Sequence, residues 1–225
     1  KDKFGENFTQ DETYYILDCE PDANVYLGFQ EDVDAGELKT ALTNAQVNGI
    51  EIPIEKYVQK HKTHKHDLFL IPNGTIHASG KNNLALEMSS TPYIFTFKMY
   101  DWQRLDLNGQ PRPINIEHAF ANLYFNRKGA YVTEKLIAKP VIGKEWKDGR
   151  KIKLPTHEEH FYVVDRYEFE GSIQIITNNQ CHVCMLVEGE TVEVRVNNKN
   201  TNFQYAETFV IPAAVGNYEL KQQGN

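Results

Sequence analysis

Apolar, β-branched and aromatic residues come in short runs along most of the chain, and the runs are bounded by Pro, Asn, Asp or Gly. Short runs of this composition between turn-forming residues are typical of β-strands. The first half contains ETYYILDCE, NVYLGF, DLFLIP, LALEM and YIFTFKMY, and the last third contains HFYVVDRYEF, GSIQIIT, CHVCMLVEG, TVEVRV and ETFVIPA. Close spacing of such strands favours a sandwich or barrel over a βαβ sheet. The pattern therefore predicts an all-β fold.

Two segments change to a helical pattern. In DVDAGELKTALTNAQ, Asp34 is suited to cap a helix, Glu37 follows three residues later, and Leu38 and Leu42 share one face. A second helix is predicted around NIEHAFANLYF, at 115–125. We therefore expect a short helical insert in the first half and some helix in the middle of the chain.

The middle of the chain, from about residue 104 to residue 155, is irregular and contains prolines near both ends. This composition is typical of a connector between two folded parts. We expect one β-barrel at 1–104, a partly helical connector at 105–155 and a second barrel at 156–225. Since the chain opens without a methionine, the first strands of the first barrel are expected to lie upstream of Lys1.

One phrase occurs twice, as DLFLIPNGTIHASG and as ETFVIPAAVGNYEL. Each copy has an acidic residue, an apolar strand and an Ile-Pro turn, which indicates a strand-turn-strand repeated in both barrels. Five residues after the proline, the first copy has His77 and the second has Asn217. The scaffold therefore does not require a histidine at this place, which makes His77 a candidate for chemistry.

Two carboxylates accompany His77 in the first barrel. Glu12 stands at the start of a predicted strand, and Glu87 lies within the apolar strand LALEM, where a carboxylate needs a partner. Imidazole and carboxylate together suit zinc and similar divalent metals. A second histidine motif, THEEH at 156–160, lacks the spacing of helical zinc proteases and is interpreted as a solvated linker.

Composition excludes some functions. The formal charge is −7 without a basic stripe, so a nucleic-acid partner is not expected. No apolar run has the length of a membrane span, so no membrane partner is expected either. Three cysteines are too few for a disulfide scaffold and fit a reducing compartment, which predicts a cytoplasmic protein. The sequence does not indicate an oligomeric state.

These motifs resemble a known family. DLFLIPNGTIHASG, followed by LALEM and FKMYDWQR, is similar to the catalytic cupin (jelly-roll) barrel of the type I mannose-6-phosphate isomerases. ETYYILD resembles the strand that carries their metal-binding glutamate. The ETFVIPAAVGNYEL phrase resembles their C-terminal cupin, which binds no metal. The resemblance covers most of the chain in the right order, and the connector is its weakest part.

The resemblance implies site residues. Glu12 and His77 would bind zinc or another divalent metal, a further ligand would come from a segment upstream of Lys1, and Glu87 would be an active-site carboxylate. Two positions depart from the family pattern, because Gln10 and Lys98 stand where the family has a basic residue and an arginine. A lysine keeps the positive charge but lacks the planar fork of arginine.

The implied function is a metal-dependent aldose-ketose isomerase that interconverts mannose 6-phosphate and fructose 6-phosphate through an enediol. Its partner would be a small-molecule sugar phosphate. Lys98 would neutralise the enediolate or hold the phosphate, and Glu87 would orient hydroxyl groups or relay a proton. The alternatives are a non-catalytic or regulatory sugar-binding cupin, favoured by Gln10 and Lys98, and a structural fragment with an incomplete pocket.

Overall fold

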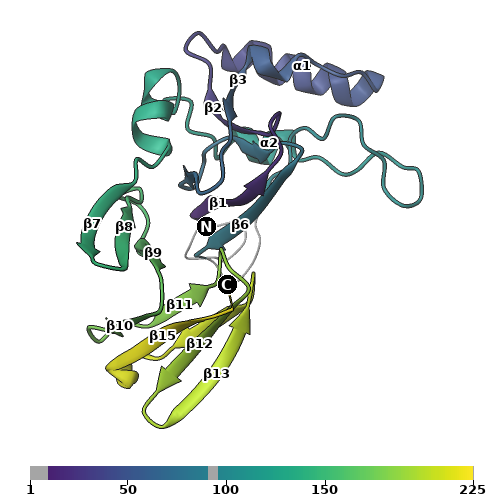
Figure 1. Cartoon of the computed structure of the whole chain (residues 1–225). Coiled ribbons are helices and arrows are strands. Elements are labelled where there is room, and N and C mark those ends of the chain that lie inside the picture. The colour runs from purple at the N-terminus through teal and green to yellow at the C-terminus, as the bar shows by residue number, and fades with distance from the viewer. Residues whose placement is uncertain (1–9, 91–95, 225) are drawn as a thin grey trace. The chain divides into compact units, whose positions relative to one another are not determined.

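The computed structural model describes residues 10–90 and 96–224, in which strands dominate and helices are few (Figure 1). The predicted all-β class is confirmed. The chain forms two compact units. Unit 1 contains the described residues up to Lys139 together with Pro155–Val163, and unit 2 contains Pro140–Leu154 and the described residues from Val164 onwards. Among the described residues, no helix has the length and apolar character needed to cross a membrane.

Unit 1 contains two three-stranded antiparallel sheets, with strand orders β4-β1-β6 and β3-β2-β5. The strands are β1 (Glu12–Cys19), β2 (Asn24–Phe29), β3 (Val58–Lys62), β4 (Leu68–Ile71), β5 (His77–Ser79) and β6 (Asn83–Ser89). Apolar side chains of both sheets share one buried cluster, which includes Ile16 of β1 and Val25 of β2. Burial of this cluster holds the two sheets together.

Both predicted helices are present in unit 1. The helix α1 (Ala35–Asn48) is capped by Asp34, whose Oδ1 accepts a hydrogen bond of 2.7 Å from the backbone N–H of Glu37. The helix α2 (Ile116–Phe120) is shorter than predicted. A 3₁₀ turn, η1 (Ile54–Lys56), and a π-helical turn, η2 (Val132–Leu136), were not predicted. Val132 and Leu136 of η2 are fully buried in the cluster shared by the two sheets.

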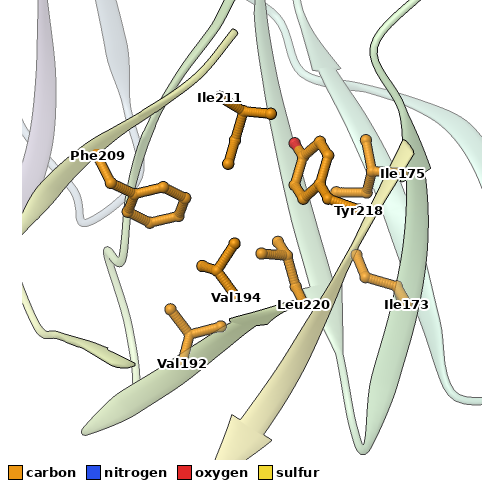
Figure 2. Packing of buried hydrophobic residues seen from close by; sticks show 8 residues of the cluster. All are labelled: Ile173, Ile175, Val192, Val194, Phe209, Ile211, Tyr218 and Leu220. Atoms are coloured by element: carbon orange, nitrogen blue, oxygen red, sulfur yellow. The ribbon is translucent and has the colours of Figure 1, made fainter. Parts of the chain in front are cut away.

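Unit 2 contains sheets of order β10-β15-β12-β13, β11-β14 and β7-β8-β9. A cluster of buried side chains forms much of its core, and Figure 2 shows Phe209, Ile211 and Tyr218 pointing toward the other members of the cluster. The elements are β7 (Val141–Trp146), β8 (Gly149–Leu154), β9 (Val164–Phe169), β10 (Ser172–Ile176), β11 (His182–Met185), β12 (Thr191–Val196), β13 (Lys199–Gln204), β14 (Thr208–Ile211), the 3₁₀ turn η3 (Ala213–Val215) and β15 (Asn217–Gln223).

The middle of the chain differs from the prediction of a separate connector at 105–155. Residues up to 139 belong to unit 1, and β7 and β8 form a hairpin that belongs to unit 2. The Asp148-Gly149 pair at this hairpin is a turn signal that the sequence contains. The chain then returns to unit 1 for residues 155–163 before β9 begins. The boundaries between the two units therefore differ from the predicted 1–104 and 156–225.

The predicted strand YIFTFKMY is absent from the described part of that segment, residues 96–100. Residues 93–95 lie outside the described residues, and residues 96–100 are not in a strand. This change matters for Lys98, because the prediction placed that residue on a strand beside the candidate site.

The repeated phrase occupies equivalent places in the two units. The strands β4 and β14 both end at the isoleucine before the proline, and β5 and β15 begin at His77 and Asn217. The turns also match, because the carbonyl oxygen of each proline accepts a hydrogen bond from the N–H three residues later. Unit 2 thus repeats this strand-turn-strand of unit 1 without the histidine.

Candidate metal centre

Strand pairing brings the two predicted carboxylates to one face of unit 1. In the antiparallel pair β1–β6, Glu12 lies opposite Ser89, and Tyr14 lies opposite Glu87. Because side chains alternate along a strand, Glu12 and Glu87 are diagonal neighbours on the same face. The register of this pair therefore places both carboxylates side by side.

His77 reaches the same place from the other sheet. It is the first residue of β5, which pairs with β2. Its Nδ1 lies 2.9 Å from the backbone oxygen of Thr75, and a carbonyl can only accept, so Nδ1 carries the proton. Its Nε2 lies 2.5 Å from Oε1 of Glu12. The predicted pair of Glu12 and His77 is therefore brought together, with Nε2 directed at the carboxylate.

Gln10 joins the two carboxylates. Its Nε2 donates to Oε2 of Glu12 at 2.7 Å and to Oε1 of Glu87 at 3.2 Å. From the sequence, Gln10 was interpreted only as the loss of a basic residue. Its position two residues before Glu12 was the available signal, because alternate residues of an extended segment face the same side. The structure gives Gln10 the role of bridging the two carboxylates without adding charge.

Burial and neighbouring charges set the protonation of this cluster. Glu12 is only 5% exposed, and although burial alone would raise its pKa, the hydrogen bond and charge of His77 keep that pKa below its usual range. Burial would lower the pKa of His77, but Glu12 raises it. Partial burial of the carboxyl group, together with Glu12, raises the pKa of Glu87 to about 7. Without a cation, Glu12 and His77 therefore form an ion pair.

Glu12 and His77 have the donor chemistry of a divalent metal centre. A metal-binding histidine usually donates its other ring N–H to a carbonyl or carboxylate, as His77 does to Thr75. Catalytic zinc sites have three protein ligands. Among residues 10–90 and 96–224, no group of three His, Cys, Asp or Glu side chains is arranged to hold a metal. The described residues thus fit two ligands of such a site and do not complete it.

Lys98 pairs with a carboxylate outside this cluster. Its Nζ is 3.3 Å from Oδ2 of Asp101, a buried carboxylate that also pairs with Arg104 and Arg112. In the described part of the chain, Lys98 has no ion pair with Glu12 or Glu87. The structure therefore brings together three of the four predicted site residues and gives Lys98 a different partner.

The THEEH motif is not the solvated linker that the sequence suggested. His157 and His160 are each only 8% exposed, and the ring of His160 stacks on Tyr162 with the centroids 5.1 Å apart. The hydroxyl of Tyr162 donates to the backbone oxygen of Met88 at 3.2 Å, which attaches this segment to β6. Residues 155–163 are therefore part of the support of unit 1.

His160 is expected to make stability depend on pH. Both ring nitrogens are buried without a hydrogen-bond partner in the described part of the chain, and burial lowers the pKa of this histidine. The carboxylates of Asp11 and Glu159 oppose this shift, whereas His157 and Arg127 add to it. As the pH falls below about 6.5, the unfolded chain takes up the proton first, so the folded state loses stability.

Replacing His160 by Phe should remove this effect. The substitution His160→Phe keeps a ring that can stack on Tyr162 and removes two unsatisfied polar atoms, so we expect a gain of about 1 kcal/mol at pH 7. Urea unfolding of both proteins at pH 7.5 and pH 5.5 measures the gain in the free energy of unfolding and its dependence on pH. The gain should be larger at the lower pH. An equal loss of stability at both pH values would show that the imidazole is needed for packing.

No family model matches the chain. It is 24% identical over 210 residues to YvyI of Bacillus subtilis strain 168, a protein named as a mannose-6-phosphate isomerase, and the match covers 93% of this chain and 60% of YvyI. It is 30% identical over 106 residues to the mannose-6-phosphate isomerase ManA of the same strain, covering 47% of this chain and 31% of ManA. The chain therefore spans about 60% of the length of YvyI.

Solved structures show the same fold. The mannose 6-phosphate isomerase of Bacillus subtilis superimposes with a TM-score of 0.75 at 22% identity, covering 94% of this chain and 62% of that protein. The apo form of the enzyme of that name from Salmonella typhimurium gives 0.61 at 13% identity, covering 98% and 66%. At these identities the structures establish the shared fold.

Proposed function

We propose that this chain, a relative of the mannose-6-phosphate isomerases, is part of a metal-dependent aldose-ketose isomerase that interconverts mannose 6-phosphate and fructose 6-phosphate. The matches confirm the resemblance that the sequence motifs indicated. The observation that carries the proposal is the distance of 2.5 Å between Nε2 of His77 and Oε1 of Glu12. A carboxylate and an imidazole nitrogen at this separation can bind one cation between them after small shifts of the side chains.

The proposed ligands are Glu12 and His77, together with a further ligand from a segment upstream of Lys1. A zinc-class cation in this place would act as a Lewis acid that stabilises negative charge on neighbouring oxygens of the sugar. Thr75 orients His77 through the hydrogen bond to Nδ1, so that Nε2 faces Glu12. Gln10 keeps the Glu12 carboxylate in place without competing for it as a charged group would.

Glu87 is the proposed proton-transfer group. Isomerisation moves a proton between C1 and C2 through an enediol, and a positioned carboxylate can accept this proton from one carbon and return it to the other. The Glu87 carboxyl group lies on the same face as Glu12 and is more exposed, so it is open to a substrate. Lys98 is retained as the proposed positive charge for the phosphate or the enediolate, although its amine is held by Asp101 in this structure.

One observation favours the alternative of a non-catalytic sugar-binding protein. Gln10 and Lys98 depart from the basic residues of the family pattern, and Lys98 is paired with Asp101. A protein with this arrangement could keep the pocket and the metal without efficient turnover, because the charge that stabilises an enediolate would be lacking.

Two measurements on the natural protein that carries this sequence test the proposal. Metal analysis should find about one zinc-class ion per chain, as expected for one site with three protein ligands. A coupled assay should show conversion of mannose 6-phosphate to fructose 6-phosphate that is lost on chelation and restored by the metal. Bound metal without turnover would support the sugar-binding alternative, and a protein without bound metal would contradict both.

A further inference from the structure

Arg127 is a buried cation that contacts the turn leading to His77. Its residue is only 4% exposed, and its Nη1 donates to the carbonyl oxygen of Pro72 at 2.8 Å, to that of Asn73, and to Oγ1 of Thr75 at 2.6 Å. Burying a guanidinium is costly unless its donors are satisfied. Here one nitrogen of the guanidinium donates to three acceptors of one short turn, so Arg127 and the turn stabilise each other.

This turn leaves little freedom for the residues before His77. Gly74 has a φ of +76°, and a Cβ at this position would lie 2.6 Å from the backbone oxygen of Asn122. The backbone oxygen of Gly74 accepts a hydrogen bond of 3.0 Å from the backbone N–H of Tyr124, and the ring centroid of Tyr124 lies 4.8 Å from the guanidinium carbon of Arg127. The turn is therefore packed on one side by residues 122–127.

A chain of hydrogen bonds extends from Arg127 to the strand that carries Glu12. Nη2 of Arg127 donates to Oε1 of Glu159 at 2.7 Å, and Nδ2 of Asn73 donates to Oε2 of the same carboxylate at 3.2 Å. The backbone N–H of Asn73 and its Nδ2 both donate to Oδ1 of Asp11, at 2.7 and 2.9 Å. Asp11 directly precedes Glu12, so one polar network contacts both the residue before Glu12 and the turn that leads to His77.

We propose that Arg127, neutralised by Glu159, is a positioning residue that holds the Thr75 carbonyl against Nδ1 of His77 and thereby directs Nε2 toward Glu12. The inference rests on the proposed function, because its consequence is an orientation of His77 that suits metal binding. The contacts of Arg127 also assign a role to the THEEH segment. Glu159 comes from that motif and is the only carboxylate that pairs with Arg127 among the described residues.

The experiment compares Arg127→Met, Arg127→Lys and the control Arg150→Met in the natural protein. Methionine keeps the apolar stem but removes all donors, whereas lysine keeps the charge without the planar fork. Arg150 also pairs with a glutamate, Glu168, at 2.5 Å, but it lies on β8 of unit 2. The control therefore removes an arginine-glutamate pair outside the candidate site.

The first readout does not require a metal. In protein with ¹⁵N-labelled histidine and no added metal, the His77 Nδ1–H proton should give a resonance protected from exchange, assigned by its loss in His77→Gln. We expect this resonance to be lost in Arg127→Met, shifted in Arg127→Lys and unchanged in Arg150→Met. A merely structural role of the arginine would leave the resonance in place in any variant that folds.

The second readout is zinc affinity, measured by competition with a chromophoric chelator. Partners that orient a metal-binding side chain typically contribute a factor of about 10–100, so Arg127→Met should bind zinc that much more weakly, with Arg127→Lys in between. A folded Arg127→Met with an unchanged resonance and unchanged affinity would overturn the inference while leaving the proposed function intact. If that variant does not fold, the same two results in Arg127→Lys decide.

If the natural protein binds no zinc, the proposed function fails, and the resonance alone then decides whether Arg127 positions His77. If it binds zinc without isomerase activity, the positioning role is judged by both readouts and the enzyme assignment fails separately.

Discussion

His77→Ala is expected to abolish metal retention and, with it, isomerase activity. His77 offers the single imidazole nitrogen of the cluster, and its Nε2 already faces the Glu12 carboxylate at 2.5 Å. Loss of a group that only orients a ligand typically weakens metal binding by about 10–100-fold, so loss of the ligand itself should exceed about 100-fold. Zinc competition and the coupled assay of mannose 6-phosphate turnover measure the two effects.

His61→Ala is a matched control for this prediction. His61 is a half-buried histidine on β3 of the same unit, and it has no contact with Glu12 or Glu87 among the described residues. The substitution His61→Ala should therefore change the stability of the protein without removing the metal. Retention of zinc and turnover in His77→Ala, at the level of the His61→Ala control, would contradict both the ligand role and the proposed function.

Glu87→Gln is expected to lower kcat by about 10²–10⁴ while the metal is retained, because that is the usual contribution of a positioned acid or base. The amide is nearly isosteric with the carboxyl group and can still hydrogen-bond to Gln10, but it cannot accept a proton from carbon. KM should change much less than kcat. Steady-state kinetics together with metal analysis separate this result from the loss of a ligand.

Glu20→Gln serves as the control for Glu87→Gln. Glu20 is an exposed carboxylate that directly follows β1, and its neutralisation makes the same change in net charge. It should leave kcat unchanged. If Glu87→Gln loses the metal instead of kcat, Glu87 is a ligand and not the proton-transfer group. Equal kinetics of the two variants would remove Glu87 from the catalytic residues.

Much of the fold could be predicted from local patterns. The strand β2 has the bounds of the apolar run NVYLGF, and the Asp34 cap of α1 was readable from its spacing to Glu37. Such features depend on residues that are neighbours in the sequence. The hairpin β7–β8 was missed although Asp148 and Gly149 stand at its turn, because its strands carry lysines and exposed side chains that resemble a connector.

The candidate site could be predicted only in part. Glu12 and His77 were found through the comparison of the two Ile-Pro phrases and the family resemblance, and the structure brings them together. The same resemblance assigned Lys98 to the candidate site, but the structure pairs Lys98 with Asp101, three residues away. The role of Gln10 depends on the position of Glu87 across a strand pair, which the sequence does not specify.

The sequence by itself determined the all-β class, the repeated strand-turn-strand and the identity of the candidate metal ligands, because strand patterns, turn signals and donor chemistry are properties of short segments. Only the tertiary structure decided that the carboxylates of β1 and β6 meet an imidazole from the opposite sheet, and that Arg127 and Glu159 close a network behind them. Register between strands and the burial of charge depend on packing between distant segments, and this information is absent from local sequence.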